Sequence, residues 1–382
     1  MARNIFNSKI FGDLTKLVQI TFDQASLNHR IMFGGSFIDD LFTWETPQYG
    51  LTVNQIIGKY NLRVMAPLIA DNAKTPVIDW DGLGTFTGKI PRFGHKMPME
   101  AEKLRKLMGD LDSTRISDDR KKQQLIDTMF ANIQDVVLGV KDSLDYLVIY
   151  ALFHQGRTVY TDANNPRGIH IPIDYLMPES NKKTAETPWT DAALKDGTVN
   201  PLDTIIEIVN QYQQKGISFE NILCSPSLMF KILNSKAVKQ SINGTDLITR
   251  PVSEGQLSSL FSEYRLPSLR PIVKEVDVLK DGKRSTISPV DDNILVFKPA
   301  GKLGVISTAF EDSQIIEEDN VSYADMDNGI RVAQWATGDS TGQGAAQYTQ
   351  ASVRALPVIT SINGVVNFDT KNTSGNIKGR SK

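Results

Sequence analysis

The sequence predicts an α+β fold built around one very long helix. Three observations support this prediction. Apolar residues recur at three- and four-residue steps over residues 118–155 without an interrupting proline. Before this segment, residues 49–99 are rich in β-branched and apolar residues with partial alternation, which indicates extended strands. After residue 201, short helical and strand patterns alternate, which is typical of a mixed α/β domain.

Composition places the chain among soluble globular proteins. Its 382 residues are 40% hydrophobic and 23% charged, enough to bury a substantial core. The net charge of −2 lacks the basic surplus of proteins that grip nucleic-acid phosphates. The single cysteine, Cys224, excludes an internal disulfide and suits a reducing compartment. No apolar run is long enough to cross a bilayer and the first residues do not resemble a signal peptide, so we expect an intracellular protein with no membrane partner.

The first half of the chain contains an irregular segment and a predicted hairpin. Residues 1–48 hold short apolar clusters that fit either an arm lying on another surface or a short helix packed on the main core. Residues 49–99 form two extended limbs around a turn-rich tip, which predicts a long hairpin. Such a hairpin has too little hydrophobic face to be stable alone, so we expect a neighbouring subunit to cover it.

The long helix has clear boundary signals. Asp118 and Asp119 lie where the positive end of a helix stabilises carboxylates, and Gly156 follows as a stop signal. At 1.5 Å per residue, residues 118–155 would span roughly 57 Å. A helix of this length crosses a whole domain, and we call it the spine helix.

The second half of the chain alternates between element types. Residues 178–197 are polar and predict a long loop, and Asp281-Gly282 predicts a hairpin turn. Helices are expected at 201–216, 227–242 and 254–264, and strands at 156–160, 168–176, 219–226, 271–290 (the hairpin), 293–301, 302–310, 329–337 and 349–368.

No catalytic constellation is apparent. The chain lacks a G-x-S-x-G elbow, an HExxH metal motif, a Walker sequence and a dinucleotide fingerprint. Cys224 ends an apolar strand, where a buried structural thiol is favoured over a nucleophile. We therefore expect no enzyme activity, no catalytic residues, no cofactor and no metal.

One cluster at the hairpin tip stands out, Asp79-Trp80-Asp81. A large aromatic side chain is costly to leave exposed at a loop tip. Trp80 either folds back on its own hairpin or anchors a contact with a neighbour, since Trp is enriched among interface hot spots. The two interpretations are nearly balanced, with the interface slightly ahead.

The order of the predicted elements and the residues within them resemble a known family. The segments that carry the resemblance are MAPLIA (65–70), FTGKIPRFGHKMPM (86–99), the spine helix with its following strand (118–160), AQWATGD (333–339) and RALPVI (354–359). They resemble the major capsid proteins of tailed phages with the Hong Kong 97-type fold, closest to the branch of the phage lambda head protein.

The resemblance implies an arrangement of domains along nearly the whole chain. The expected parts are an N-terminal arm at 1–48, an extended loop (E-loop) at 49–99, a peripheral domain at 100–202 with spine helix 118–155, an axial α/β domain at 203–328, a return to the peripheral domain at 329–368, and a polar tail at 369–382.

The resemblance also implies a function and partners. The chain would assemble as hexamers and pentamers into an icosahedral shell around the double-stranded DNA of a tailed phage, in the host cytoplasm, and remain in the virion. Expected partners are further copies of itself, a separate scaffolding protein, a portal protein, a decoration protein as a further candidate, and packaged DNA through weak non-specific contacts. Candidate intersubunit contacts are Trp80, Asp79, Asp81, Lys74, Arg92 and Lys96. Some relatives crosslink a loop lysine to a neighbour; Lys74 is the obvious candidate, although a solvated lysine is the favoured interpretation.

Alternative functions remain open at this point. An encapsulin-type compartment shell shares the fold, but such chains are usually shorter. A hydrolase using carboxylates such as Asp79 and Asp81 lacks any nucleophile–base arrangement. A tail protein of the virion would also be non-catalytic, but tail-tube proteins are mostly β and the spine helix argues against one.

Overall fold

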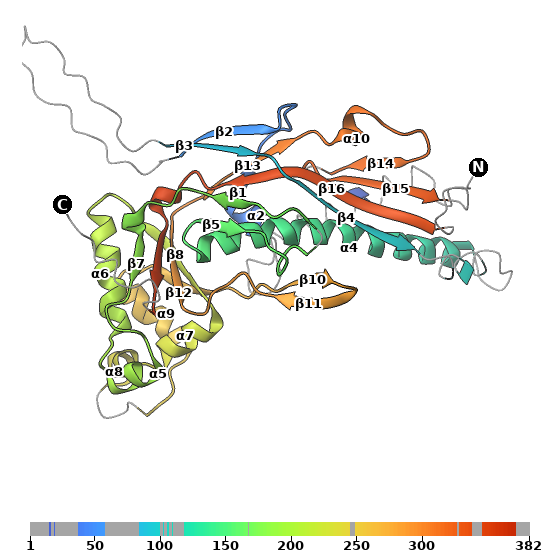
Figure 1. The fold of residues 1–382 in the computed structure, drawn as a ribbon. Helices are drawn as coiled ribbons and strands as arrows, with labels where there is room; N and C mark the ends of the chain where they lie inside the picture. Colours follow the sequence, from blue (N-terminus) through green and yellow to red (C-terminus); the bar gives the residue numbers. More distant parts are fainter. Residues whose placement is uncertain are drawn as a thin grey trace, which may run out of the picture.

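The computed structural model describes residues 37–57, 84–99, 118–166, 168–244, 249–326, 328–337 and 346–371, with a few isolated positions elsewhere. Figure 1 shows a long helix running beneath an extended sheet, with a second group of strands and helices at one end. In the described parts of the chain, no helix is both long and apolar enough to cross a membrane.

The spine helix is α4, Asp118–Phe153. The sequence prediction is confirmed, with the end two residues earlier than expected. Gln155 and Gly156 have positive φ angles of 55° and 78°, so the chain leaves the helix through a left-handed turn. Residues that recur at helical spacing are fully buried: Ile133, Val136, Val137, Val140, Leu144, Leu147 and Ala151.

A six-stranded sheet lies on the spine helix (Figure 1). β16 is its longest strand; β4 pairs with residues 347–354 of it, and β15 and β13 pair with its successive halves. A parallel strand, β1, extends the sheet beyond β13. The strands are β1 (Phe42–Trp44), β4 (Arg92–Met99), β13 (Gly304–Ala309), β14 (Ser322–Asp325), β15 (Arg331–Thr337) and β16 (Ala346–Val358).

A five-stranded sheet in the order β7-β17-β12-β8-β9 forms a second layer with five helices. β12 contributes side chains to both hydrophobic cores, because alternate side chains of a strand face opposite sides. Ile294 and Val296 belong to the core around the spine helix, whereas Leu295 and Phe297 belong to the second core. The elements are β7 (Lys182–Thr184), β8 (Phe219–Cys224), β9 (Ser268–Pro271), β12 (Ile294–Pro299), β17 (Val366–Asp369), α5 (Asp191–Asp196), α6 (Pro201–Gln213), α7 (Pro226–Leu233), α8 (Lys236–Asn243) and α9 (Glu254–Glu263).

Three strand pairs complete the described structure: β2 (Thr52–Ile57) with β3 (Gly84–Lys89), β5 (Arg157–Val159) with β6 (Pro172–Asp174), and β10 (Val276–Lys280) with β11 (Lys283–Ile287). The predicted turn at Asp281-Gly282 is confirmed, with φ angles of 51° and 77°. β2 and β3 pair as the limbs of the predicted hairpin, but β4 leaves it and joins the six-stranded sheet. Short helices are α2 (Phe37–Leu41), α10 (Asp312–Ile315), η1 (Glu179–Asn181) and η4 (Ile362–Gly364).

Several local predictions were wrong. The helix expected at 227–242 is two helices, α7 and α8, because Ser235 caps a new helix by accepting from the backbone N–H of Val238. The loop expected at 178–197 contains η1, β7 and α5, and β14 lies where no strand was expected. Asp369 and Thr370 are buried, so the solvated tail cannot begin at residue 369.

Of residues 1–48 the structure describes 37–48 and three isolated positions, so the arm expected at 1–48 lies largely outside the described residues. In α2, Phe37, Ile38 and Leu41 are buried in the core around the spine helix. This helix follows directly into β1, which pairs with β13.

Candidate assembly surfaces

The six predicted contact residues fall into two groups. Lys74, Asp79, Trp80 and Asp81 lie outside the described residues. Arg92 and Lys96 both lie on β4, four positions apart and therefore on the same face of that strand. β4 pairs with β16, where Arg92 lies opposite Arg354 and Lys96 opposite Gln350.

Arg92 is engaged within its own subunit. Its Nε lies 2.8 Å from Oε2 of Glu311, whose side chain is fully buried. Burial raises the pKa of Glu311, and the charges of Arg92 and Arg354 oppose that rise. The guanidinium of Arg92 remains partly exposed, so it offers surface to a neighbour only beside this ion pair.

Lys96 lies beside two aromatic rings. Its Nζ is 5.4 Å from the centre of the Tyr348 ring, and Tyr348 stacks on Trp335 at 5.6 Å between ring centres. A cation at this distance from a ring face is worth about 0.5–1 kcal/mol when exposed. This row of Lys96, Tyr348 and Trp335 crosses three neighbouring strands, β4, β16 and β15.

A second surface lies between β13 and β14, at residues 310–321, which contain α10. We call this segment the clamped loop, because arginines from the sheet hold it. Arg92 of β4 pairs with Glu311, and Nη2 of Arg354 of β16 lies 2.8 Å from Oδ2 of Asp312. Two adjacent acids are therefore fixed to two different strands.

Arg331 of β15 supplies the third attachment. Its side chain is buried and pairs with Glu317 at the far end of the clamped loop. Arg331 also reaches Oδ1 of Asp325 at 3.2 Å and lies over the Tyr323 ring at 4.3 Å from its centre. Two carboxylates and an aromatic face therefore balance the charge of this buried guanidinium, although its Nε has no hydrogen-bond partner among the described residues. The loop is consequently attached at both ends to the same sheet.

The clamped loop presents apolar side chains to solvent. Ile315 and Ile316 are 60% and 76% exposed although the segment around them is anchored. At the start of the clamped loop, Phe310 packs on Tyr49, which is 81% exposed, with 4.7 Å between ring centres. Exposed apolar groups held on a fixed backbone are typical of a contact surface.

A buried charge cluster joins the spine helix to two distant segments. Oδ1 of Asp145 accepts the backbone N–H of Ile38 at 2.9 Å. Nζ of Lys274 lies 2.9 Å from Oδ2 of Asp145 and 2.7 Å from Oδ1 of Asp142. Burial raises the pKa of Asp145 to about 6, against the lowering effect of Lys274. This cluster was not predicted from the sequence, although a carboxylate inside an apolar helical stretch was an available signal.

A neighbouring set of bonds holds the segment that leads into β1. Nζ of Lys141 on the spine helix lies 2.8 Å from Oδ2 of Asp39, and Nε1 of Trp44 donates to Oδ1 of Asp39 at 2.9 Å. Nζ of Lys302 donates to the backbone oxygens of Asp39 and Phe42 at 2.8 and 3.0 Å. α2 and β1 are thereby fastened to both the helix and the sheet.

The described residues assemble no recognisable active site. Within them, no group of three or more His, Cys, Asp or Glu side chains could hold a metal ion. Cys224 is buried as predicted, and burial raises the pKa of its thiol, which keeps it protonated and unreactive. The carboxylates of the hydrolase hypothesis, Asp79 and Asp81, lie outside these residues.

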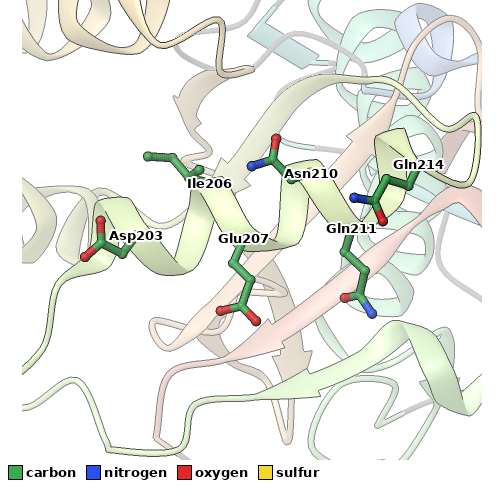
Figure 2. A pocket seen from close by; sticks show the side chains of 6 residues that line it. All are labelled: Asp203, Ile206, Glu207, Asn210, Gln211 and Gln214. Atoms are coloured by element: carbon green, nitrogen blue, oxygen red, sulfur yellow. The ribbon is translucent and has the colours of Figure 1, made fainter.

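One hollow on the surface follows the exposed face of α6. Figure 2 shows the side chains that line it arranged along this helix. The lining residues, five on α6 and one at its C-cap, are Asp203, Ile206, Glu207, Asn210, Gln211 and Gln214. A ligand pocket normally draws converging groups from several elements, so this hollow does not indicate one.

A comparison with known protein families shows what kind of protein carries these surfaces. The family model of phage major capsid protein E matches residues 31–370. The chain belongs to this family. It is a major capsid protein, a structural and non-enzymatic component of the virion that forms the icosahedral shell of the phage head.

A solved structure supports the fold. A protein described as the capsid protein of a prophage of Escherichia coli CFT073 is 14% identical with a TM-score of 0.54, covering 91% of this chain and 98% of that one. Together with the family match, it shows that the major capsid protein has the mixed α+β fold of Hong Kong 97-type capsid proteins. The capsid of cyanophage A-1(L) is 11% identical with a TM-score of 0.44, covering 90% and 94%. No curated protein matches the sequence.

Proposed function

We propose that this major capsid protein assembles as hexamers and pentamers around the double-stranded DNA of a tailed phage, in the host cytoplasm, and that it belongs to the lambda-like branch. The family match over residues 31–370 carries this proposal. The net charge of −2 supports it, because a near-neutral lining lets a genome pack and leave through weak non-specific contacts.

The proposed domain organisation follows the two hydrophobic cores. The core around the spine helix and six-stranded sheet would be the peripheral domain, with the return segment at 329–368. The five-stranded sheet with α5–α9 would be the axial domain around the five- and six-fold axes. This differs from the axial range of 203–328 expected from the sequence, because β13 and β14 of that range pair in the six-stranded sheet. Residues 49–99 would be the extended loop, and the antiparallel pairing of β2 with β3 supports this.

Partners follow from the same proposal. A separate scaffolding protein, a portal protein and a decoration protein would act with the shell. Trp80, Asp79, Asp81 and Lys74 are proposed contacts at the tip of the extended loop, and Lys96 is a proposed contact on β4. Arg92 would act beside its ion pair with Glu311.

The test is electron microscopy of the expressed full chain after size-exclusion chromatography, with and without its scaffolding protein. The proposal expects closed shells, tens of nanometres across, with both six- and five-fold capsomers. A chain that stays monomeric even with scaffold supplied would contradict it. A shell loaded with a host enzyme would instead indicate an encapsulin-type compartment.

A further inference from the structure

The clamped loop carries a specific combination of groups. Ile315 and Ile316 project into solvent, and the next exposed side chains along the chain include Glu318 and Asp319. The other acids of this loop are occupied by the three arginines of the sheet, whereas no ion pair of Glu318 or Asp319 occurs among the described residues. The loop thus offers an apolar pair bordered by two available negative charges.

The β10–β11 hairpin carries the opposite combination. We call it the basic hairpin, residues 276–287. Leu279 is 42% exposed near its turn, and it is followed by Lys280, Lys283 and Arg284. Within the described part of the chain neither lysine forms an ion pair, whereas Nη1 of Arg284 lies 4.0 Å from Oδ2 of Asp277 on the facing strand. The hairpin tip thus offers an apolar side chain beside two lysines without an ion pair, with Asp281 at the turn between them.

These two surfaces lie on opposite sides of the subunit. In Figure 1, α10 lies beyond the six-stranded sheet on one side, and the basic hairpin lies beyond the spine helix on the other. One subunit therefore cannot join its own two surfaces. Complementary patches on opposite sides of one chain generate a heterologous, head-to-tail contact, which forms a ring when the rotation between successive copies closes.

We propose that the basic hairpin of one subunit docks on the clamped loop of the next subunit in the capsomer. Leu279 covers Ile315 and Ile316, while Lys280 and Lys283 face Glu318 and Asp319. The apolar contact supplies the affinity. The charges determine that each hairpin binds the clamped loop of the next subunit, which gives the ring one direction. This inference rests on the proposed function, because it concerns a contact between copies within a hexamer or pentamer.

Disulfide trapping tests the contact directly. The full chain carrying Asp319→Cys and Lys283→Cys is oxidised after assembly and run on a non-reducing gel. Cys224 is the only native cysteine and is buried, so it contributes no background. We expect a ladder of linked oligomers up to the hexamer. The matched pair Asp319→Cys with Lys195→Cys, which uses an exposed lysine of α5, should give no ladder.

Charge reversal tests the same contact by function. Glu318→Lys alone and Lys283→Glu alone should each lower the yield of shells at least tenfold, and the double variant should restore it. The control Asp292→Lys, at an exposed position between β11 and β12, should assemble normally. Ile316→Ser should also lower the yield, whereas Ile169→Ser, at a similarly exposed isoleucine, should not.

The outcomes separate the two proposals. A wild-type chain that forms no shell overturns both. Normal shells from the wild type together with no ladder, or with full assembly of Ile316→Ser and Glu318→Lys, overturn the docking contact and leave the capsid function intact. Circular dichroism of each variant subunit shows that a lost shell does not result from a lost fold.

Discussion

Asp145 illustrates how one residue organises distant parts of this subunit. It lies on the buried face of the spine helix, where an unpaired carboxylate would be strongly unfavourable. Lys274 and the backbone N–H of Ile38 satisfy its two oxygens. One side chain therefore fixes the segment before β10 and the helix before β1 to the same point of the spine.

The first prediction concerns the pH dependence of this site. The pKa of Asp145 is raised from 3.8 to about 6 by burial, so between these values the native state binds more protons than the unfolded state. Stability therefore falls as the pH rises through this window. The side chain of the Asp145→Asn variant cannot titrate. Between pH 3.8 and about 6, the free energy of unfolding of the wild type should therefore fall by on the order of 3 kcal/mol more than that of this variant.

Urea unfolding of disassembled subunits at several pH values between 3.5 and 7 measures this difference. Asp292→Asn, at an exposed position, serves as the control and should follow the wild type at every pH. Parallel curves for the wild type and Asp145→Asn would show that the carboxyl does not titrate in this range.

The second prediction concerns Trp80, which was expected at the tip of the proposed extended loop. If its indole anchors a neighbouring subunit, Trp80→Ala should raise the critical concentration for assembly by about 30-fold, equivalent to about 2 kcal/mol at a hot spot. The melting temperature of the isolated subunit should change little. Light scattering and calorimetry give the two quantities. Equal losses in assembly and in subunit folding would indicate that Trp80 packs on its own hairpin.

At the scale of elements, local patterns could be predicted and distant pairings could not. The spine helix was predictable because its apolar spacing and its glycine stop lie within one segment. The break between α7 and α8 was missed because apolar residues continue on both sides of Ser235, and only the cap geometry reveals a second helix. β7 and β14 are short strands that exist through pairing with β17 and β15, which a local pattern does not contain.

The third prediction concerns the turn that ends the spine helix. Gly156 has a φ of 78°, and an added Cβ would come within 2.7 Å of Cβ of Met177. Gly156→Ala should therefore destabilise the subunit by about 2–4 kcal/mol, through left-handed strain together with overpacking. Gly301→Ala is the matched control, since its φ is 85° but an added Cβ meets nothing within 4 Å. It should cost only about 1–2 kcal/mol.

Chemical unfolding of the two variants compares these costs. Equal destabilisation would mean that Met177 moves aside and that the close approach contributes nothing. A larger loss for Gly156→Ala would show that the end of the spine helix is fixed by the packing of the chain after β6.

At the scale of the whole molecule, the resemblance predicted the family and the fold, but the sequence could not place the assembly surfaces. Arg92 was singled out as an intersubunit contact, yet its partner Glu311 lies far along the chain and becomes a neighbour only through the pairing of β4 with β16. The clamped loop was missed for the same reason. Its exposed isoleucines become informative only once the arginines that hold the segment are known.

The last prediction concerns the salt dependence of assembly. The Debye length shortens from about 10 Å at 0.1 M salt to about 3 Å at 1 M, so a charged contact at a subunit rim weakens across this range. Salt also strengthens apolar contacts, so the response of the wild type alone does not isolate the charges.

The double variant Glu318→Gln with Lys283→Gln removes one proposed charge pair and keeps the apolar contact. We expect the critical concentration of the wild type to rise more steeply with salt than that of this variant, by about threefold over the range. Because Asp292→Asn with Lys371→Gln removes the same charges at exposed positions outside α5–α9 and outside both proposed surfaces, it should retain the wild-type slope. If both double variants follow the wild type, the charges that direct the ring lie on another surface.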